Sequence, residues 1–353
     1  MKKSLLALAV LGAFAGVASA QSSVTLFGTV DLSAKYVKND GSDRRVSLSQ
    51  DGINSSQLGF RGTEDLGGGL KAGFLLLGGL SADTGRSSGE TAGKFFNRSA
   101  YLRLMGGFGE VRLGRDYTPT FWNDTIFDAF GTNGLGDSSH VGQLFAATFV
   151  RADNSIGYFL PSGIGGVYGQ VMAAASEGGA SANGVNGGRY VGGRIGFAAG
   201  PFDIAGAYGQ QRVDAVAGAP SQKTYNIGGS YDLGVVKLMG YYDRDTLSYA
   251  GFDKKEDRYS ISAVVPLGQG EIHAGYERSK LKNSIANNSN SISQFAVGYV
   301  YNLSKRTALY TTYSRVSNGN LSANSVAGGS AQTAAPTAGG KSSGAEFGVR
   351  HFF

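Results

Sequence analysis

The chain lacks cysteine and is poor in proline and tryptophan. Among its 353 residues there are six prolines, one tryptophan (Trp122) and no cysteine. No disulfide framework can therefore hold the fold together, which must rely on size and backbone pairing. Long apolar runs are also missing. After residue 20 no stretch approaches the roughly eighteen apolar residues of a membrane-spanning helix, which excludes a bundle of such helices.

Helical periodicity and catalytic spacings are absent too. No segment after residue 20 repeats apolar residues at i, i+3, i+4 and i+7. The net charge of +6 comes without a basic block, so nucleic acid is not an expected partner. His140, His273 and His351 are scattered, and this spacing predicts neither a metal site nor a cofactor. The letters GRSSG at 85–89 match a nucleophile elbow, but no helical pattern follows them, so we predict no enzyme.

The N-terminus has the pattern of an export signal. Lys2 and Lys3 precede LLALAVLGAFAGVASA, a short apolar run that ends in Ala18-Ser19-Ala20. This order predicts a signal peptide over residues 1–20, removed after Ala20, and one domain over 21–353; a retained membrane anchor is the alternative. Removing two of the 32 basic residues against 26 acidic ones leaves a mature charge of +4.

What the chain has in abundance is glycine, aromatic residues and period-two alternation. It contains 57 glycines, 18 tyrosines and 20 phenylalanines. The stretch VTLFGTVDLSAKY at 24–36 alternates apolar or small residues with polar ones along most of its length. Similar alternation recurs in segments such as FDIAGAYGQQR, TYNIGGSYDL, RYSISAVVPL, EIHAGYERSK, SQFAVGYVYNL and AEFGVRHFF. Each of these segments predicts a β-strand.

The connections between the strands alternate in length. Seven short turns are found at 65–69, 106–109, 161–166, 198–201, 232–235, 266–270 and 302–305. Eight longer polar segments lie near 38–54, 82–95, 117–149, 178–187, 214–222, 249–256, 283–291 and 318–342. This pattern predicts an all-β fold, a transmembrane antiparallel β-barrel of sixteen strands with short turns at one end and long loops at the other. A closed barrel satisfies every backbone group inside a bilayer.

The barrel interpretation assigns two faces to each strand. Leu58 and Phe60 are expected to face lipid, whereas Gln57 and Arg61 face water inside the barrel. A soluble β-sandwich with its apolar face packed inward is the alternative. Tyrosines near strand ends, typical of aromatic girdles, and the terminal pair Phe352-Phe353 argue against the sandwich.

Several ordered segments carry a family resemblance. They are SSVTLFGTVDLSAKYV, GFRGTEDLGGGLKAGF, FNRSAYLRL, GFGEVRLGRD, YNLSKRTALYTTYS and GVRHFF. Together they resemble the general, non-specific porins of Gram-negative outer membranes, of the β-proteobacterial type, over nearly the whole of 21–353. The resemblance implies a homotrimeric channel for passive diffusion of ions and small hydrophilic solutes. It also implies contact with outer-membrane lipid and lipopolysaccharide, insertion by the barrel-assembly machinery, and Phe353 as part of the assembly signal.

The longest internal loop, 117–149, is rich in apolar residues, among them Phe121, Trp122 and Phe130. This content indicates a segment packed against the inner wall; an external loop that contacts a neighbouring subunit is the alternative. The resemblance implies that this third long loop folds into the lumen. Its IFDAFG stretch then places Asp128 at the constriction and Asp124 near it.

Opposite the loop, the resemblance places a basic cluster made of Arg61, Arg98 and Arg151. Arginines facing carboxylates would create a transverse field and weak anion selectivity, although each arginine could instead be an ordinary solvated lumen residue. Gln57 departs from the family, which commonly has arginine there.

Leu77 also departs from the family, which often has glutamate there. Leu75 and Leu77 should both face the lumen, which is unusual for a water-filled pore. Either a bulge turns this strand, or the two leucines pack beneath the third loop.

The alternative functions are a substrate-selective channel or a phage and antibody receptor on the same barrel, and an outer-membrane hydrolase.

Overall fold

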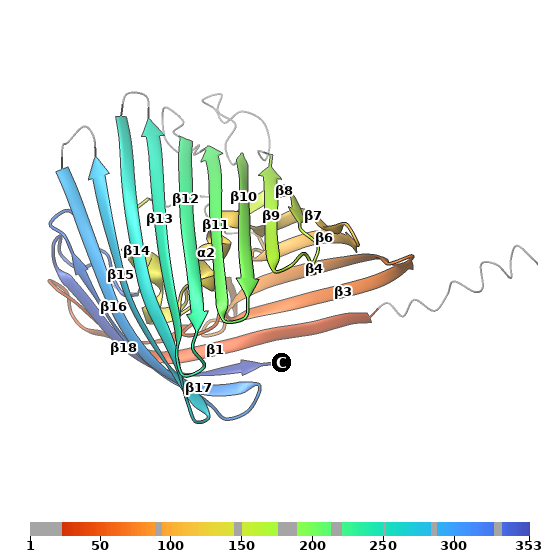
Figure 1. The fold of residues 1–353 in the computed structure, drawn as a ribbon. Helices are drawn as coiled ribbons and strands as arrows, with labels where there is room; N and C mark the ends of the chain where they lie inside the picture. Colours follow the sequence, from red (N-terminus) through yellow and green to blue (C-terminus); the bar gives the residue numbers. More distant parts are fainter. Residues whose placement is uncertain are drawn as a thin grey trace, which may run out of the picture.

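The structure, a computed structural model, describes residues 23–88, 94–144, 150–175, 189–212, 221–249, 252–283, 288–327 and 334–353. The expected signal peptide, residues 1–20, lies outside these ranges. Within them the strands form one continuous sheet that curves into a barrel around a short helix (Figure 1).

Sixteen strands make the wall of the described barrel. They are β1 (Ser23–Asn39), β3 (Gln57–Gly67), β4 (Leu70–Ser81), β6 (Ser99–Gly106), β7 (Gly109–Tyr117), β8 (Arg151–Phe159), β9 (Val167–Ala174), β10 (Tyr190–Ala199), β11 (Phe202–Arg212), β12 (Ser221–Asp232), β13 (Lys237–Tyr249), β14 (Phe252–Leu267), β15 (Gly270–Asn283), β16 (Asn288–Asn302), β17 (Thr307–Asn318) and β18 (Lys341–Phe352). Successive strands pair antiparallel, and β1 pairs with β18 from Thr29/Phe352 to Asn39/Ser342. The sheet therefore closes, and the predicted sixteen-stranded barrel is confirmed.

Two short strands lie in segments that the sequence assigned to loops. β2 (Arg45–Gln50) pairs with the loop end of β1, from Leu32/Gln50 to Val37/Arg45. β5 (Arg86–Ser88) pairs with the last residues of β4. Both lie toward the loop end of the barrel. There β3 ends before its neighbour β1, and β6 ends before its neighbour β4, so β2 and β5 pair with the remaining residues of β1 and β4. β1 and β14, with 17 and 16 residues, are also longer than a bilayer crossing of about 9–11 residues requires.

The barrel is apolar outside and polar inside. On β1, Val24 and Leu26 are 65% and 54% exposed, whereas Thr29, Asp31 and Ser33 are at most 3% exposed. The register pairs Thr29 with Gln57 and Thr25 with Arg61, so these two β3 residues share the inner face. This inverted pattern is expected of a barrel surrounded by lipid and excludes the soluble sandwich.

The third long loop contains three short helices: α2 (Pro119–Ile126), η1 (Gly134–Gly136) and η2 (Ser138–Val141). Thr118 caps α2 by accepting a hydrogen bond from the Phe121 N–H at 3.4 Å. Phe127, fully buried, packs against Ala205 and Tyr241 on the inner face of the wall. The loop therefore lies inside the barrel, as Figure 1 shows for α2. No helix among the described residues is long and apolar enough to cross a membrane.

Leu77 lies on the inner face of β4, only 8% exposed. Its side chain and the Phe27 ring cover Gly59 so closely that a β-carbon at Gly59 would lie within 3 Å of both. The β3/β4 register is regular from Gln57/Gly79 to Asp65/Lys71, so no bulge turns this strand. Leu77 therefore packs with Phe27 over Gly59, on the inner surface of the wall.

Candidate functional site

The loop is fastened to the wall by backbone N–H groups that donate to buried carboxylates. The N–H of Leu135 donates to Glu346 Oε1 at 3.1 Å. Those of Gln143 and Leu144 donate to Glu256 at 3.0 and 2.8 Å. Hydrogen bonds to a charged group are stronger than those between neutral groups, so the two glutamates anchor the end of the loop.

Helix α2 is held by an amide pair. Asn123 Nδ2 donates to Ala205 O at 3.1 Å and to Asn226 Oδ1 at 2.9 Å, while Asn226 Nδ2 donates to Thr120 O at 3.0 Å. Along the loop, α2 contacts β9–β12, and η1 and η2 contact β15–β18. The loop thus covers the arc of the wall from β9 to β18. The uncovered side of the lumen is lined by β3, β4, β6, β7 and β8.

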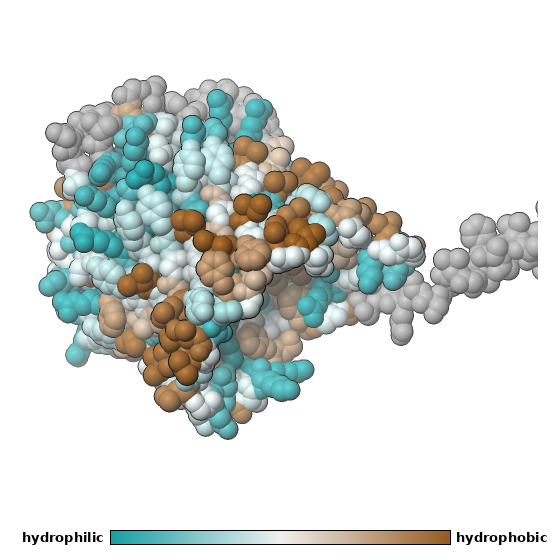
Figure 2. Space-filling view, in the orientation of Figure 1, coloured by the Kyte–Doolittle hydropathy of each residue, from teal (hydrophilic) through white to brown (hydrophobic). Residues whose placement is uncertain are grey.

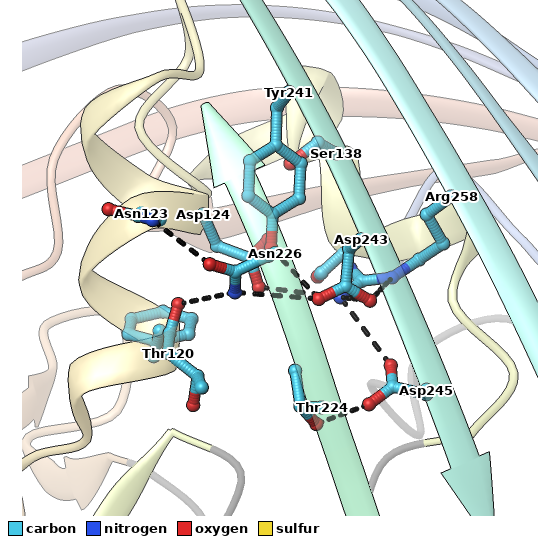
Figure 3. A network of polar contacts seen from close by, with 12 residues as sticks. Thr120, Asn123, Asp124, Ser138, Thr224, Asn226, Tyr241, Asp243, Asp245 and Arg258 are labelled. Carbon is cyan, nitrogen blue, oxygen red and sulfur yellow. Dashed lines mark hydrogen bonds and ion pairs between the residues drawn. The ribbon is translucent and has the colours of Figure 1, made fainter. Parts of the chain in front are cut away.

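Asp124 faces the covered wall. Its carboxylate lies 3.5 Å from Arg258, whose guanidinium also contacts Asp243 at 2.9 Å and Asp245 at 3.7 Å (Figure 3). All four side chains are at most 5% exposed. In this arrangement Asp124 docks α2 onto β13 and β14, and Arg258, which it shares with Asp243 and Asp245, offsets part of its charge.

Asp128 is also engaged, by its own loop. Its carboxylate accepts hydrogen bonds from the N–H groups of Phe130 and Thr132 at 2.9 and 3.0 Å and from Ser138 Oγ at 2.9 Å. The residue is 7% exposed. Asp128 therefore organises the turn that follows α2.

Burial controls the charge of this loop. It raises the pKa of Asp128 to about 6, against the hydrogen bonds from Phe130 and Thr132 that favour the ionised form. Burial also raises the pKa of Asp124, although Arg258 opposes the shift. The pKa of His140 is lowered by burial, so this imidazole stays neutral. The loop consequently loses negative charge when the pH falls through about 6.

Acidification from about pH 8 to about pH 5 should increase the preference of the channel for anions. Because the pKa of Asp128 is raised, the carboxyl takes up a proton as pH falls through about 6, which removes one negative charge beside the lumen. Reversal potentials in a salt gradient measure the change. Asp128→Asn should remove the step near pH 6, with Asp232→Asn, at an exposed short turn, as the control. A step that survives in Asp128→Asn would contradict the assignment.

On the uncovered side, Arg98 and Arg151 converge on one tyrosine. Their Nη2 atoms donate to the Tyr117 hydroxyl at 3.5 and 2.7 Å, and the Arg151 guanidinium lies 4.4 Å from the centre of the Tyr117 ring. The Tyr117 ring in turn stacks on Phe121 of α2, with centroids 5.6 Å apart. Tyr117, at the start of the loop, therefore holds the two guanidiniums together. Arg98 and Arg151 are far apart in the sequence, so the sequence alone does not reveal this contact.

Arg61 and Gln57 lie on the inner face of β3, part of the same uncovered side. The Arg61 guanidinium lies 5.0 Å from the centre of the Phe27 ring. In the described part of the chain, neither Arg61 nor Arg98 has a carboxylate within ion-pair distance. By contrast, Arg112 on β7 is paired with Glu110 and Asp116 at 2.7 and 2.8 Å.

The sequence analysis missed a set of acidic residues on the inner face of the wall, all of them beside the third loop except Asp31. They occupy inward positions of β1, β13, β14, β15 and β18 and are nearly fully buried: Asp31, Asp243, Asp245, Glu256, Glu277 and Glu346. Only Lys35 and Arg258 contact members of this set as ion-pair partners in the described ranges. Acids at alternate positions of the predicted strands, on the face expected to line the lumen, were the available signal. No group of described residues could hold a metal ion.

The chain matches the Gram-negative porin family over residues 7–321. It belongs to that family. The porin is 38% identical to outer membrane porin protein 32 of Delftia acidovorans, with both chains fully covered. It is 31% identical to an outer membrane porin protein of Bordetella pertussis, covering 90% of this chain and 95% of the relative. The solved anion-selective porin from Comamonas acidovorans superposes with a TM-score of 0.83 at 35% identity, covering 94% of this porin and all of that chain.

Family membership settles the class of function. The porin is a channel of the outer membrane that passes small solutes, in a family whose members are usually trimeric. It is not an enzyme, so the outer-membrane hydrolase is excluded.

Proposed function

We propose that this porin is a weakly anion-selective, water-filled diffusion channel for ions and small hydrophilic solutes. One observation carries the proposal: in the described ranges no carboxylate lies within ion-pair distance of Arg61 or Arg98, and Asp51 acts on Arg98 only at longer range. Asp124, by contrast, is paired with Arg258, and Asp128 accepts hydrogen bonds from the loop backbone. The 35% identical relative from Comamonas acidovorans, described as anion-selective, supports the same polarity.

The arginines act through a transverse field. Arg61, Arg98 and Arg151 stand on one side of the lumen, and the acids behind the loop stand on the other, screened by the loop. A unit charge about 10 Å from a passing ion contributes roughly 0.4 kcal/mol at a dielectric constant of about 80 and about 1.7 kcal/mol at about 20. Each arginine is therefore strong enough to tilt the selectivity and too weak to set it alone.

Reversal potentials in a salt gradient test the proposal. The unmodified channel should prefer anions, Arg98→Gln should weaken the preference, and Gln57→Arg should strengthen it by adding a guanidinium to the inner face of β3. All shifts should shrink as salt rises, because ions screen charges over about 10 Å at 0.1 M. Lys305→Gln, in an exposed short turn, is the control. A cation preference, or no response to Gln57→Arg at low salt, would refute the filter.

We also propose the wider setting of the channel: removal of the signal after Ala20, insertion by the barrel-assembly machinery, a homotrimer, and contact with lipopolysaccharide in the outer leaflet. Phe353 is proposed as part of the assembly signal. The contacts that support this role are reciprocal backbone hydrogen bonds between Phe353 and Gly28, both 3.1 Å, at the β1/β18 seam.

Deleting Phe353 should leave unassembled chain in the periplasm, because the seam loses this pair and the assembly signal loses its terminal residue. Heat-modifiable mobility of outer-membrane fractions measures assembly. Normal amounts of surface-exposed trimer would contradict the role.

A further inference from the structure

A row of aromatic side chains crosses the outer face of the barrel from β12 to β16. Its members point away from the lumen: Tyr225, Tyr242, Tyr259, Tyr276 and Phe295. Tyr242 pairs with Tyr259 across the strands, with ring centroids 5.1 Å apart, and Tyr276 pairs with Phe295. Aromatic girdles of this kind mark the level where the apolar band of a barrel meets the head groups.

Cations lie directly beyond this row, toward the end that carries the long loops. The outer basic patch, as we call it, consists of Lys223, Arg244, Lys255, Arg278, Lys280 and Lys282. Arg244 follows Tyr242 by two residues, and Arg278 follows Tyr276 by two. At about 3.3 Å per residue, the first cations stand roughly 7 Å beyond the rings along the strand.

The patch belongs to the outside of the barrel. On β15, Arg278, Lys280 and Lys282 are exposed, whereas the intervening Glu277 and Ser279 are 1% and 0% exposed and face inward. These cations therefore cannot serve the lumen. Figure 2 shows hydrophilic residues gathered over the upper ends of β12–β15 and hydrophobic residues lower on the same face.

Much of the patch charge is unbalanced. Arg244 is paired with Asp257 at 2.7 Å and Lys255 with Asp253 at 3.8 Å. Asp257 also stands opposite Lys280 in the register, but the cations of β15 have no ion pair in the described ranges. On their other side, β16 offers only serines: Ser293, Ser291 and Ser289 pair with Arg278, Lys280 and Lys282. Within the described chain none of these three cations forms an ion pair, although Lys282 acts on Asp257 at longer range, and all three are exposed on the outside of the barrel.

We propose that the outer basic patch binds the phosphate groups of lipopolysaccharide in the outer leaflet. A cluster of cations immediately above an aromatic girdle is at head-group level, where lysine and arginine attract anionic lipid. Phosphate oxygens accept the charge-assisted hydrogen bonds that guanidinium and ammonium groups donate. The acyl chains would then lie along the apolar surface below the tyrosines. The inference rests on the proposed contact with lipopolysaccharide and adds the place and the chemistry of that contact.

The test compares two triple variants of the full-length porin, purified in detergent. In the patch variant, Arg278→Ser, Lys280→Ser and Lys282→Ser extend the serine pattern of β16. The control variant removes three exposed cations near the short turns at the opposite end: Lys71→Ser, Lys305→Ser and Arg306→Ser. Native mass spectrometry measures binding of rough-type lipopolysaccharide and of the same lipid after dephosphorylation.

The patch variant should bind the phosphorylated lipid roughly 100-fold more weakly, at about fivefold for each lost cation. The control variant should bind as the unmodified porin does, and dephosphorylation should weaken binding to the unmodified porin and to the control variant but not to the patch variant. Unchanged affinity of the patch variant would overturn the site. Absence of binding to the unmodified porin would overturn the lipopolysaccharide contact itself.

Two further readouts separate this inference from others. Conductance and reversal potential should be unchanged in the patch variant, because its substitutions lie outside the lumen; the channel proposal therefore stands or falls independently. Loss of the oligomer in the patch variant, with lipid binding retained, would show that the patch contacts a second copy of the chain and would refute the lipid site.

Discussion

Replacing residues 120–148 with a short Gly-Ser linker should raise single-channel conductance several-fold and move the selectivity toward cations. The loop fills the arc from β9 to β18, so its removal widens the aqueous path. The barrel should still close, because the Thr118 N–H donates to Val150 O at 3.1 Å and the two ends of the loop are already neighbours. Planar-bilayer recordings and liposome swelling with larger sugars measure the change.

The shift in selectivity follows from what the loop covers. Its removal exposes the wall carboxylates that it covers, among them Glu256 and Glu346. The ion-pair partners of the wall acids in the described chain are Lys35 and Arg258 alone. Adding Glu256→Gln and Glu346→Gln to the shortened porin should therefore restore part of the anion preference. Unchanged conductance would mean that the loop does not narrow the path, and a wider but equally anion-selective channel would mean that the wall acids are neutral.

Arg258→Met should release α2 from the wall while leaving the barrel intact. The substitution leaves Asp124, Asp243 and Asp245 close together without their cation, and removing one partner from a buried ion pair destabilises by about 3–5 kcal/mol. The strands keep their backbone pairing, so the loss falls on the docked loop. We expect a noisy open state with higher mean conductance, and faster protease cleavage within 118–144.

Arg258→Lys is the matched control, because it keeps the charge and loses the planar geometry. It should give an intermediate phenotype. Triple replacement of the three aspartates by asparagine in the Arg258→Met background should reduce the noise again, since no unpaired carboxylate remains in this cluster of described residues. A quiet channel of normal conductance in Arg258→Met would show that this cluster does not hold the loop.

The wall of the barrel could be predicted from the sequence because its signals are local. Alternation at 24–36 depends only on the two-residue period of a strand, and the short turns read directly from glycine-rich stretches. The same rule correctly gave Leu58 outward and Gln57 inward. Strands β2 and β5 were not predicted from the sequence. They form because their longer neighbours β1 and β4 have backbone groups free to pair with them beyond the ends of β3 and β6.

The sequence by itself thus determined the closed, inside-out barrel and, through its family resemblance, identified Arg61, Arg98 and Arg151 as candidates. Only the tertiary structure decided what these residues and the loop acids contact. Arg258 reaches Asp124, and Arg98 meets Arg151 on Tyr117, because the barrel brings distant strands and the loop together across the lumen. Such contacts depend on closure of the whole sheet and on the path of the loop inside it. The two-residue alternation along a single strand carries no information about either.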